Sequence, residues 1–219
     1  MSRLTIFLGN KTYSSWSLRP WLALHHVGVP FDEVVIRLDQ PDTREQLLRH
    51  SPSGRVPALR DDGLILWESL AICEHLAERF PEAHLWPEDR AARARARAVS
   101  CEMHAGFAAL RSAMPMNLQR PVAPVAYGEA AQADLDRIVA LWSECRAAAP
   151  DGAFLFGRFS IADAMFAPVV TRFHTYAVQV PPVAAEYMTA IRATPGMLAW
   201  TAAAATENRR IEKYEVPAK

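Results

Sequence analysis

The feature that most constrains this chain is a change of hydrophobic pattern between residues 81 and 90. Before it, short apolar runs of strand length alternate with segments of helical period, in the order β-α-β-α-β-β-α. After it, apolar residues recur at helical spacing only. At 219 residues, the chain is long enough for two compact domains. We therefore predict an α/β domain over 1–80, a linker over 81–90 and an all-α domain over 91–219.

The α/β part is predicted to contain a mixed sheet. A helix joins the first two strands, which should therefore be parallel. Asp61-Asp62-Gly63 separates two short apolar runs and predicts an antiparallel hairpin. The strands are expected at 4–8, 31–38, 57–60 and 64–67, and the helices at 17–27, 43–50 and 69–80.

The all-α part is predicted to consist of five helices. They are expected at 89–118, 129–149, 161–176, 182–192 and 196–207. Pro115 is expected to kink the first of them or to end it early. Ser160 and Asp163 have the spacing of a capping box, with Asp in place of Glu. We interpret this pair as a folding signal and assign it no catalytic role.

The charge balance excludes several classes of partner. Lys plus Arg and Asp plus Glu each number 24, so there is no broad basic field for a nucleic acid or a membrane. The stretch 91–98 is rich in Ala and Arg, but a helix spreads these arginines over several faces, which favours a solvated surface. No apolar run reaches the ~18 residues typical of a membrane span, and the apolar run at the N-terminus is too short for a signal peptide. We expect neither nucleic-acid nor membrane binding.

The three cysteines, Cys73, Cys101 and Cys145, are widely spaced and form no C-x-x-C pair. A zinc ribbon or a dithiol redox motif is therefore not expected. Cys73 and Cys101 fall in apolar helical stretches, where buried, inert thiols are common. His104 and His174 are interpreted as structural or solvated, and no cluster of His, Cys and carboxylates predicts a metal site. Reduced thiols suit the cytosol.

A first motif with chemical potential lies between the first predicted strand and the first predicted helix. It reads Y-S-S-W-S-L-R over 13–19. The N–H groups at a helix N-terminus are unpaired and the helix dipole favours negative charge there. A hydroxyl at this point, such as that of Ser14, can donate to a thiolate and lower the pKa of the thiol. Alternatively, Ser14 or Ser15 caps the helix.

Two further motifs follow within residues 1–80. Val56-Pro57 begins a predicted strand, and a cis bond there would expose the Val56 backbone to a peptide ligand. Glu68-Ser69 begins a predicted helix, where the Ser69 hydroxyl and nearby N–H groups can hold a carboxylate and Glu68 can pair with an ammonium. Taken singly, the first is a turn and the second is a surface acid beside a helix cap.

Together, S-S-W-S-L-R, S-G-R-V-P-A-L and W-E-S-L-A-I resemble the glutathione site of the cytosolic glutathione S-transferase family. The serine cluster is most similar to the zeta class and to bacterial proteins like maleylacetoacetate isomerase. This resemblance implies a thioredoxin-like N-terminal domain followed by an all-helical domain. It also implies a transferase that uses glutathione as co-substrate, a role in detoxification, a cytoplasmic location and a homodimer.

The resemblance also implies roles for individual residues. Ser14 matches the serine that activates the thiol, with Ser15 as the second candidate and a displaced Tyr13 as a third. Trp16 stands where the zeta class has cysteine. The residues implied to bind glutathione are Ser14, Ser15, Trp16, Ser17, Arg19, Arg55, Val56, Glu68 and Ser69.

The site of the electrophile is expected between the two domains, because ligand sites favour such clefts. Its candidate residues lie on the predicted helix 89–118, and core packing is the alternative for its apolar members. They are Met103, Phe107, Arg111, Met114 and Asn117.

Several functions remain open on this fold. A zeta-like cis–trans isomerase acting on a maleyl-type diacid would need cations for two carboxylates, and Arg19 and Arg111 are the candidates. A thiol oxidoreductase is disfavoured, because no cysteine precedes Cys73. A non-catalytic glutathione- or ligand-binding protein is the alternative from a different class, since fold does not fix function.

Overall fold

A computed structural model describes residues 4–149 and 151–216. Its four-stranded sheet has the order β2-β1-β3-β4. Parallel pairing joins β1 to β2, and antiparallel pairing joins β1 to β3 and β3 to β4, as the sequence predicts. The strands are β1 (Leu4–Leu8), β2 (Phe31–Val35), β3 (Ala58–Asp61) and β4 (Leu64–Trp67).

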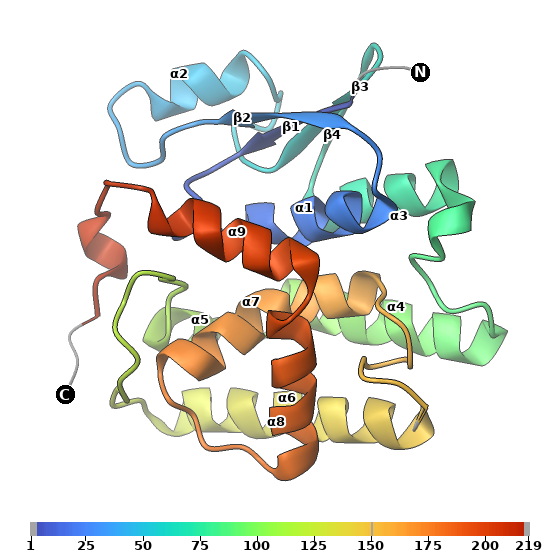
Figure 1. Ribbon diagram of the computed structural model, residues 1–219. Helices are drawn as coiled ribbons and strands as arrows, with labels where there is room; N and C mark the ends of the chain where they lie inside the picture. Colours follow the sequence, from blue (N-terminus) through green and yellow to red (C-terminus); the bar gives the residue numbers. More distant parts are fainter. Residues whose placement is uncertain (1–3, 150, 217–219) are drawn as a thin grey trace.

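Helices cover both faces of this sheet (Figure 1). α1 (Ser15–Val27) and α3 (Ser69–Arg79) pack on one face and on each other, while α2 (Thr43–Leu48) covers the other face. The alternation along β1 explains the two layers: Leu4, Ile6 and Leu8 join the main core, whereas Phe7 packs in a small cluster on the α2 side. The N-terminal part therefore has the predicted thioredoxin-like architecture.

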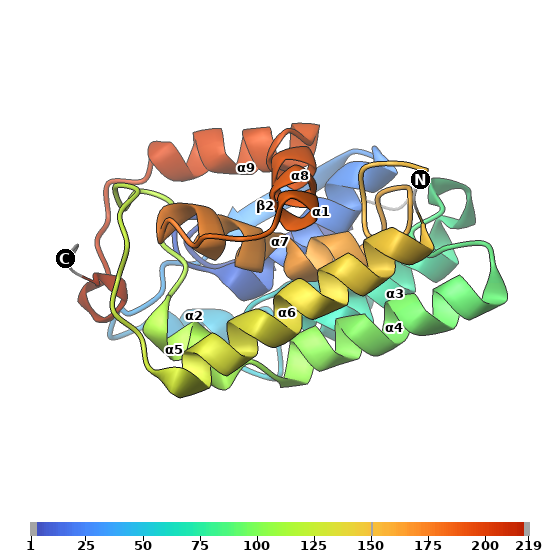
Figure 2. The ribbon, with the colours of Figure 1, turned by 90° about the horizontal axis from the view of Figure 1, so that it is seen from below.

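The rest of the described chain forms helices and connecting loops, with two isolated β-bridges, Phe154–Gly157 and Phe156–Arg158. Its helices are α4 (Arg90–Ala105), α5 (Ala108–Ala113), α6 (Glu129–Ala148), α7 (Ile161–Thr175), α8 (Pro182–Arg192) and α9 (Pro195–Ala205). α7 is the central helix, nearly all of it buried, and it packs against both α1 and α4. Seen from below, α4 and α6 run along the outer side of this half (Figure 2). None of the helices within 4–149 and 151–216 has the length and apolar character that crossing a bilayer requires.

The main correction to the predicted elements concerns the helix expected at 89–118. The chain leaves the helix at Gly106 and restarts at Phe107, which has a left-handed φ of 63°. A Cβ at Gly106 would lie 2.9 Å from the carbonyl oxygen of Glu102, so this corner requires glycine. The break therefore falls before Pro115, which follows the end of α5.

Smaller differences concern element ends and one thiol. The strand expected at 31–38 ends at Val35, and α1 begins two residues before the predicted start. Cys101 is exposed, not buried as predicted, whereas Cys73 and Cys145 are buried. The buried side of α4 includes Ala96, Val99 and Met103, and Cys101 falls outside this stripe.

The capping box at the start of α7 is confirmed. The Asp163 carboxylate accepts hydrogen bonds from the N–H and the hydroxyl of Ser160, both at 2.9 Å, and from the N–H of Leu155 at 3.1 Å. The side chain of Asp163 is fully buried, and this burial raises its pKa to about 6. The pair anchors the central helix and does not line the cavity described next.

Candidate active site

A cavity of about 580 Å³ lies where the start of α1, the segment before β3, the end of β4, the start of α3 and the end of α4 meet. It brings together residues that are far apart in the sequence. They are Trp16, Ser53, Arg55, Val56, Pro57, Trp67, Glu68 and His104. Of the nine residues predicted to bind glutathione, this cavity is lined by Trp16, Arg55, Val56 and Glu68.

One wall of the cavity is the segment before β3. The Val56–Pro57 peptide bond is cis, as the second motif allows, and both residues line the cavity. Ser53 shapes this loop, since its hydroxyl accepts a hydrogen bond from the N–H of Arg55 at 3.2 Å and lies 2.8 Å from the Ser51 hydroxyl. Ser53 is the first residue of the motif S-G-R-V-P-A-L, and the sequence predicted no role for it.

The start of α3 forms the next wall. Glu68 has a φ of 82°, a left-handed conformation that is uncommon outside glycine and that clusters at functional sites. Its carboxylate caps α3 through the N–H of Leu70 at 3.3 Å. The adjacent Ser69, next after Glu68 in the sequence, is fully buried and is not among the residues that line the cavity, and its hydroxyl has no partner among the described residues. A buried unpaired hydroxyl costs free energy unless a ligand or water satisfies it.

The serines at the start of α1 are engaged with one another. The Ser14 hydroxyl donates to the Ser17 hydroxyl at 2.8 Å and accepts from the Ser17 N–H at 3.4 Å, so Ser14 is the N-cap of α1. The Ser17 hydroxyl in turn accepts from the N–H of Gly9 at 3.0 Å. Ser14 and Ser15 are only 6 % and 7 % exposed. Within the described chain, neither serine is among the residues that line the cavity.

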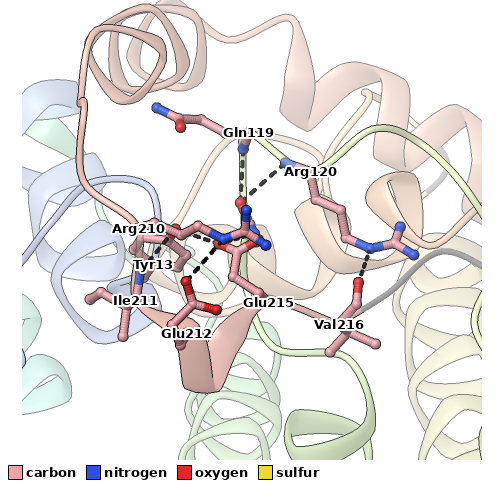
Figure 3. A network of polar contacts seen from close by, with 9 residues as sticks. Tyr13, Gln119, Arg120, Arg210, Ile211, Glu212, Glu215 and Val216 are labelled. Atoms are coloured by element: carbon pink, nitrogen blue, oxygen red, sulfur yellow. Dashed lines mark hydrogen bonds and ion pairs between the residues drawn. The ribbon is translucent and has the colours of Figure 1, made fainter.

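The phenol of Tyr13 takes part in a network with the C-terminal segment (Figure 3), and Tyr13 is not among the described residues that line the cavity. Its hydroxyl donates to the Glu215 carboxylate at 2.6 Å and accepts from the N–H of Ile211 at 3.3 Å. Burial, and then the hydrogen bond to Glu215, raise the pKa of Tyr13 to about 12. Asn117 belongs to the same network, because its amide donates to Glu215 at 3.1 Å. Tyr13, Asn117 and Glu215 line a second cavity of about 600 Å³.

Trp16 connects the cavity to a group of buried and half-buried arginines. The guanidinium carbons of Arg19 and Arg111 lie 4.3 and 4.8 Å from the centre of the Trp16 ring. Arg19 is fully buried, its Nε donates to the Met165 carbonyl at 3.2 Å, and its two terminal nitrogens have no partner among the described residues. Burial lowers the pKa of Arg19, and the charges of Arg111 and Arg172 lower it further.

Arg172 is the third of these cations. It is buried and donates to the carbonyls of Met114 and Pro168, at 2.8 and 3.0 Å, and to the Ser15 hydroxyl at 3.4 Å. Burial, and then the charge of Arg111, lower its pKa to about 9. Arg19, Arg111 and Arg172 thus lie near the N-terminal end of α1, close enough for their positive charges to interact.

His104 reaches the cavity, although it was predicted to be structural or solvated. Its Nε2 lies 3.2 Å from the Glu68 carboxylate, and its ring meets Trp16 edge-on at 5.3 Å. Burial lowers the pKa of His104 more than Glu68 raises it. No local pattern could have identified this pair, because Glu68 and His104 belong to different halves of the chain.

The residues predicted for the electrophile are dispersed. Met103, Phe107 and Met114 belong to the hydrophobic core, which agrees with the alternative stated for them. Asn117 lies at the second cavity. Arg111 alone among them reaches this site, through its stack on Trp16.

Comparisons with known proteins agree with this geometry. Residues 13–79 match the family model "Glutathione S-transferase, N-terminal domain", and residues 124–203 match "Glutathione S-transferase, C-terminal domain". A probable maleylacetoacetate isomerase of Caenorhabditis elegans is 34 % identical over 48 % of this chain and 48 % of the relative. The maleylacetoacetate isomerase of Pseudomonas aeruginosa is 36 % identical over 50 % of this chain and 53 % of the relative. The chain thus spans about half the length of these two curated relatives.

Solved structures share the fold. A glutathione transferase homolog from Burkholderia gl BGR1, crystallised with bound glutathione, superposes with a TM-score of 0.73 at 24 % identity, over 94 % of this chain and 100 % of that one. At this identity, the likeness concerns the fold alone. With both family domains matched in order on this architecture, the chain belongs to the glutathione S-transferase family.

Proposed function

We propose that this protein is a glutathione transferase, which binds glutathione in the cavity and activates its thiol for attack on a small electrophile. The observation that carries the proposal is the pair Glu68–Ser69. A carboxylate and an unpaired buried hydroxyl stand side by side at the N-terminus of α3. An α-amino acid head group presents the complementary ammonium and carboxylate, and the helix N-terminus favours its negative end.

Other residues that line the cavity fit the rest of a tripeptide. In the proposed complex, Val56 would pair its backbone with the backbone of the central residue, and Arg55 would offer a cation at the cavity edge. Arg55 is exposed, so its contribution would be small and sensitive to salt.

When bound, glutathione supplies a thiol whose anion is a strong nucleophile. The start of α1 and the buried arginines provide a positive field on that side of the cavity, which favours the anion over the thiol. Ser14 and Ser15 remain the proposed hydroxyl donors. The Ser15 proton is the more available one, since Arg172 donates to the Ser15 oxygen while the Ser14 proton is already given to Ser17.

Titration calorimetry with glutathione and turnover of chlorodinitrobenzene test this proposal. We expect the wild type to bind glutathione and to conjugate it, and we expect Ser69→Ala to weaken binding. Binding without turnover of any electrophile would instead favour a non-catalytic glutathione-binding protein. Absence of binding would overturn the proposal.

A second candidate is the isomerisation of a maleyl-type diacid. It is favoured by Arg19 and Arg111 beside the cavity, since cations are needed to hold two carboxylates, and by the two isomerase relatives. Incubation with maleylacetoacetate and glutathione tests it, and formation of the trans isomer at a rate above that of conjugation would make it the main activity.

We also propose that the protein acts as a homodimer. Leu64 and Trp67 on the edge strand β4 are large apolar residues with exposed fractions of 48 % and 46 %, and a second copy would cover them. Light scattering after size-exclusion chromatography measures the mass, and a monomer at micromolar concentration would contradict the proposal.

A further inference from the structure

The two oxygens of the Glu68 carboxylate have different surroundings. Oε2 accepts a hydrogen bond from the N–H of Leu70 at 3.3 Å and lies 3.2 Å from Nε2 of His104. Oε1 has no partner among the described residues, and Glu68 lines the cavity. The protein therefore holds one oxygen of this carboxylate and leaves the other to a ligand.

His104 reaches Glu68 from the helical half of the chain. It lies in the last turn of α4, and its ring meets Trp16 edge-on at 5.3 Å. Nε2 carries the ring proton, because an unprotonated nitrogen this close to a carboxylate oxygen would be repelled by it. Nδ1 is buried and has no partner within the described chain. A second proton, on Nδ1, would thus be a buried donor without an acceptor, which costs free energy.

The charges around His104 also favour the neutral ring. Burial lowers the pKa of His104, Glu68 at the start of α3 raises it, and Arg19 of α1 and Arg111 of α5 lower it further, so that the net shift is downward. α7 also packs against α4, but none of its described residues adds a charge to this set. The imidazole is therefore neutral at neutral pH. It contacts the Glu68 carboxylate and leaves the negative charge of that group in place.

We propose that His104 is a positioning residue for Glu68, which holds Oε2 so that Oε1 and the full negative charge of the carboxylate face the ammonium of the γ-glutamyl head group. This inference rests on the proposed function and assigns the selectivity for a ligand that carries an ammonium to a pair of residues from the two halves of the chain. A permanent cation at position 104 would pair with Glu68 and compete with the ligand, whereas a neutral ring orients the carboxylate without competing.

The first test uses S-methylglutathione, which keeps the head group and has no thiol proton to titrate. His104→Leu keeps apolar bulk beside Trp16 and loses both ring nitrogens. We expect calorimetry to show that this variant binds S-methylglutathione about tenfold more weakly than the wild type does. The analogue with glutaryl in place of γ-glutamyl has no ammonium, and it should bind to both proteins with the same low affinity. A merely structural defect would weaken the binding of both ligands alike.

The second test uses pH, because a bound ammonium beside Glu68 and a proton on His104 disfavour each other. The affinity of the wild type for S-methylglutathione should therefore fall as the pH is lowered from about 8 to about 5. His104→Gln keeps an N–H donor and cannot titrate, so we expect an affinity near that of the wild type at about pH 8 and no comparable loss at low pH. His174→Gln is the matched control, since burial also lowers the pKa of His174 but this residue does not line the cavity.

The outcomes separate this inference from the proposed function. A wild type that binds neither glutathione nor S-methylglutathione would overturn both. A wild type that binds them, with no weakening in His104→Leu or with equal weakening for both ligands, would overturn the role of His104 alone. The same pH dependence in His104→Gln as in the wild type would also overturn that role. A loss confined to the ligand with the ammonium, together with a pH dependence that disappears in His104→Gln and persists in His174→Gln, would establish it.

Discussion

The N-terminal ends of α3 and α7 contain the same chemical groups, but these groups have different roles. Each combines a serine with a carboxylate side chain, Glu68 with Ser69 in α3 and Ser160 with Asp163 in α7. In α7 the described donors and acceptors are matched and buried. In α3 the serine hydroxyl is buried without a partner, and the acid faces a cavity. Polar groups that are paired internally stabilise the fold, whereas those left unpaired are available to a ligand.

The largest effect on stability is expected from removing the internally paired carboxylate at the start of α7. Asp163→Ala would leave the N–H groups of Leu155 and Ser160 and the Ser160 hydroxyl without their shared acceptor. We expect a loss of about 3–5 kcal/mol in the free energy of unfolding, as for other buried polar networks. Denaturant unfolding measures it, and a loss below about 1 kcal/mol would contradict the assignment of Asp163 as the anchor of the central helix.

The pH dependence of that pair sharpens the comparison. The pKa of Asp163 is about 6 in the folded protein and 3.8 for a free side chain, so the folded state binds more protons between these values. The contribution that proton binding by this carboxyl makes to stability is therefore fully present below about pH 4 and is lost as the pH rises through about 6, in total about 3 kcal/mol.

The neutral variant Asp163→Asn isolates this contribution. Relative to the wild type, its stability should improve as the pH rises from about 4 to 7, since only the wild type then buries a charge. Unfolding curves of both proteins at matched pH values give the difference. A constant difference across this range would mean that the hydrogen bonds to Asp163 fully offset its burial.

The sequence predicts the features of the fold that depend on local spacing, and it fails for features that depend on contacts between distant segments. The capping box in α7, the hairpin and the order of the elements follow from local spacing, which sequence contains directly. The exposure of Cys101 depends on which face of α4 meets α7, a contact between distant segments. The two family domains were likewise recognisable from short motifs alone.

The site was predicted in part for the same reason. Val56 and Glu68 line the cavity as their motifs indicate. The stack of Arg111 on Trp16 and the hydrogen bond from Arg172 to Ser15 arise only when α1 packs against the helical half. A motif shows which groups can meet a ligand, and the packing decides which of them are already occupied.

Substitution of the unpaired serine at the start of α3 should affect ligand binding and not stability, the opposite of the result expected at the start of α7. Ser69→Ala removes a hydroxyl that stabilises nothing in the described fold, so we expect unchanged or slightly higher stability. Affinity for glutathione should fall by about 10- to 100-fold, the value of a hydrogen bond to a charged group.

Ser160→Ala is the matched control for this variant, being the same substitution at the start of α7. It should lower stability by about 1 kcal/mol and leave glutathione affinity intact. Calorimetry and thermal unfolding of the two variants together test the contrast. Equal losses of stability with no difference in affinity would remove the distinction between the two helix starts.

The smallest effect is expected from Tyr13→Phe. This variant tests whether the Tyr13 hydroxyl serves only the fold, like the groups at the start of α7, or also contacts the ligand. The Tyr13 phenol is hydrogen-bonded to Glu215 and its pKa is raised to about 12, so it stays protonated and paired across the physiological range. Glu215 retains the amide of Asn117 when the phenol is removed, so we expect a stability loss of only about 1 kcal/mol. The thiol pKa of bound glutathione should not change. A rise of that pKa by about one unit would show that the phenol reaches the thiol in the complex, and Tyr13 would then join Ser69 among the groups that serve the ligand.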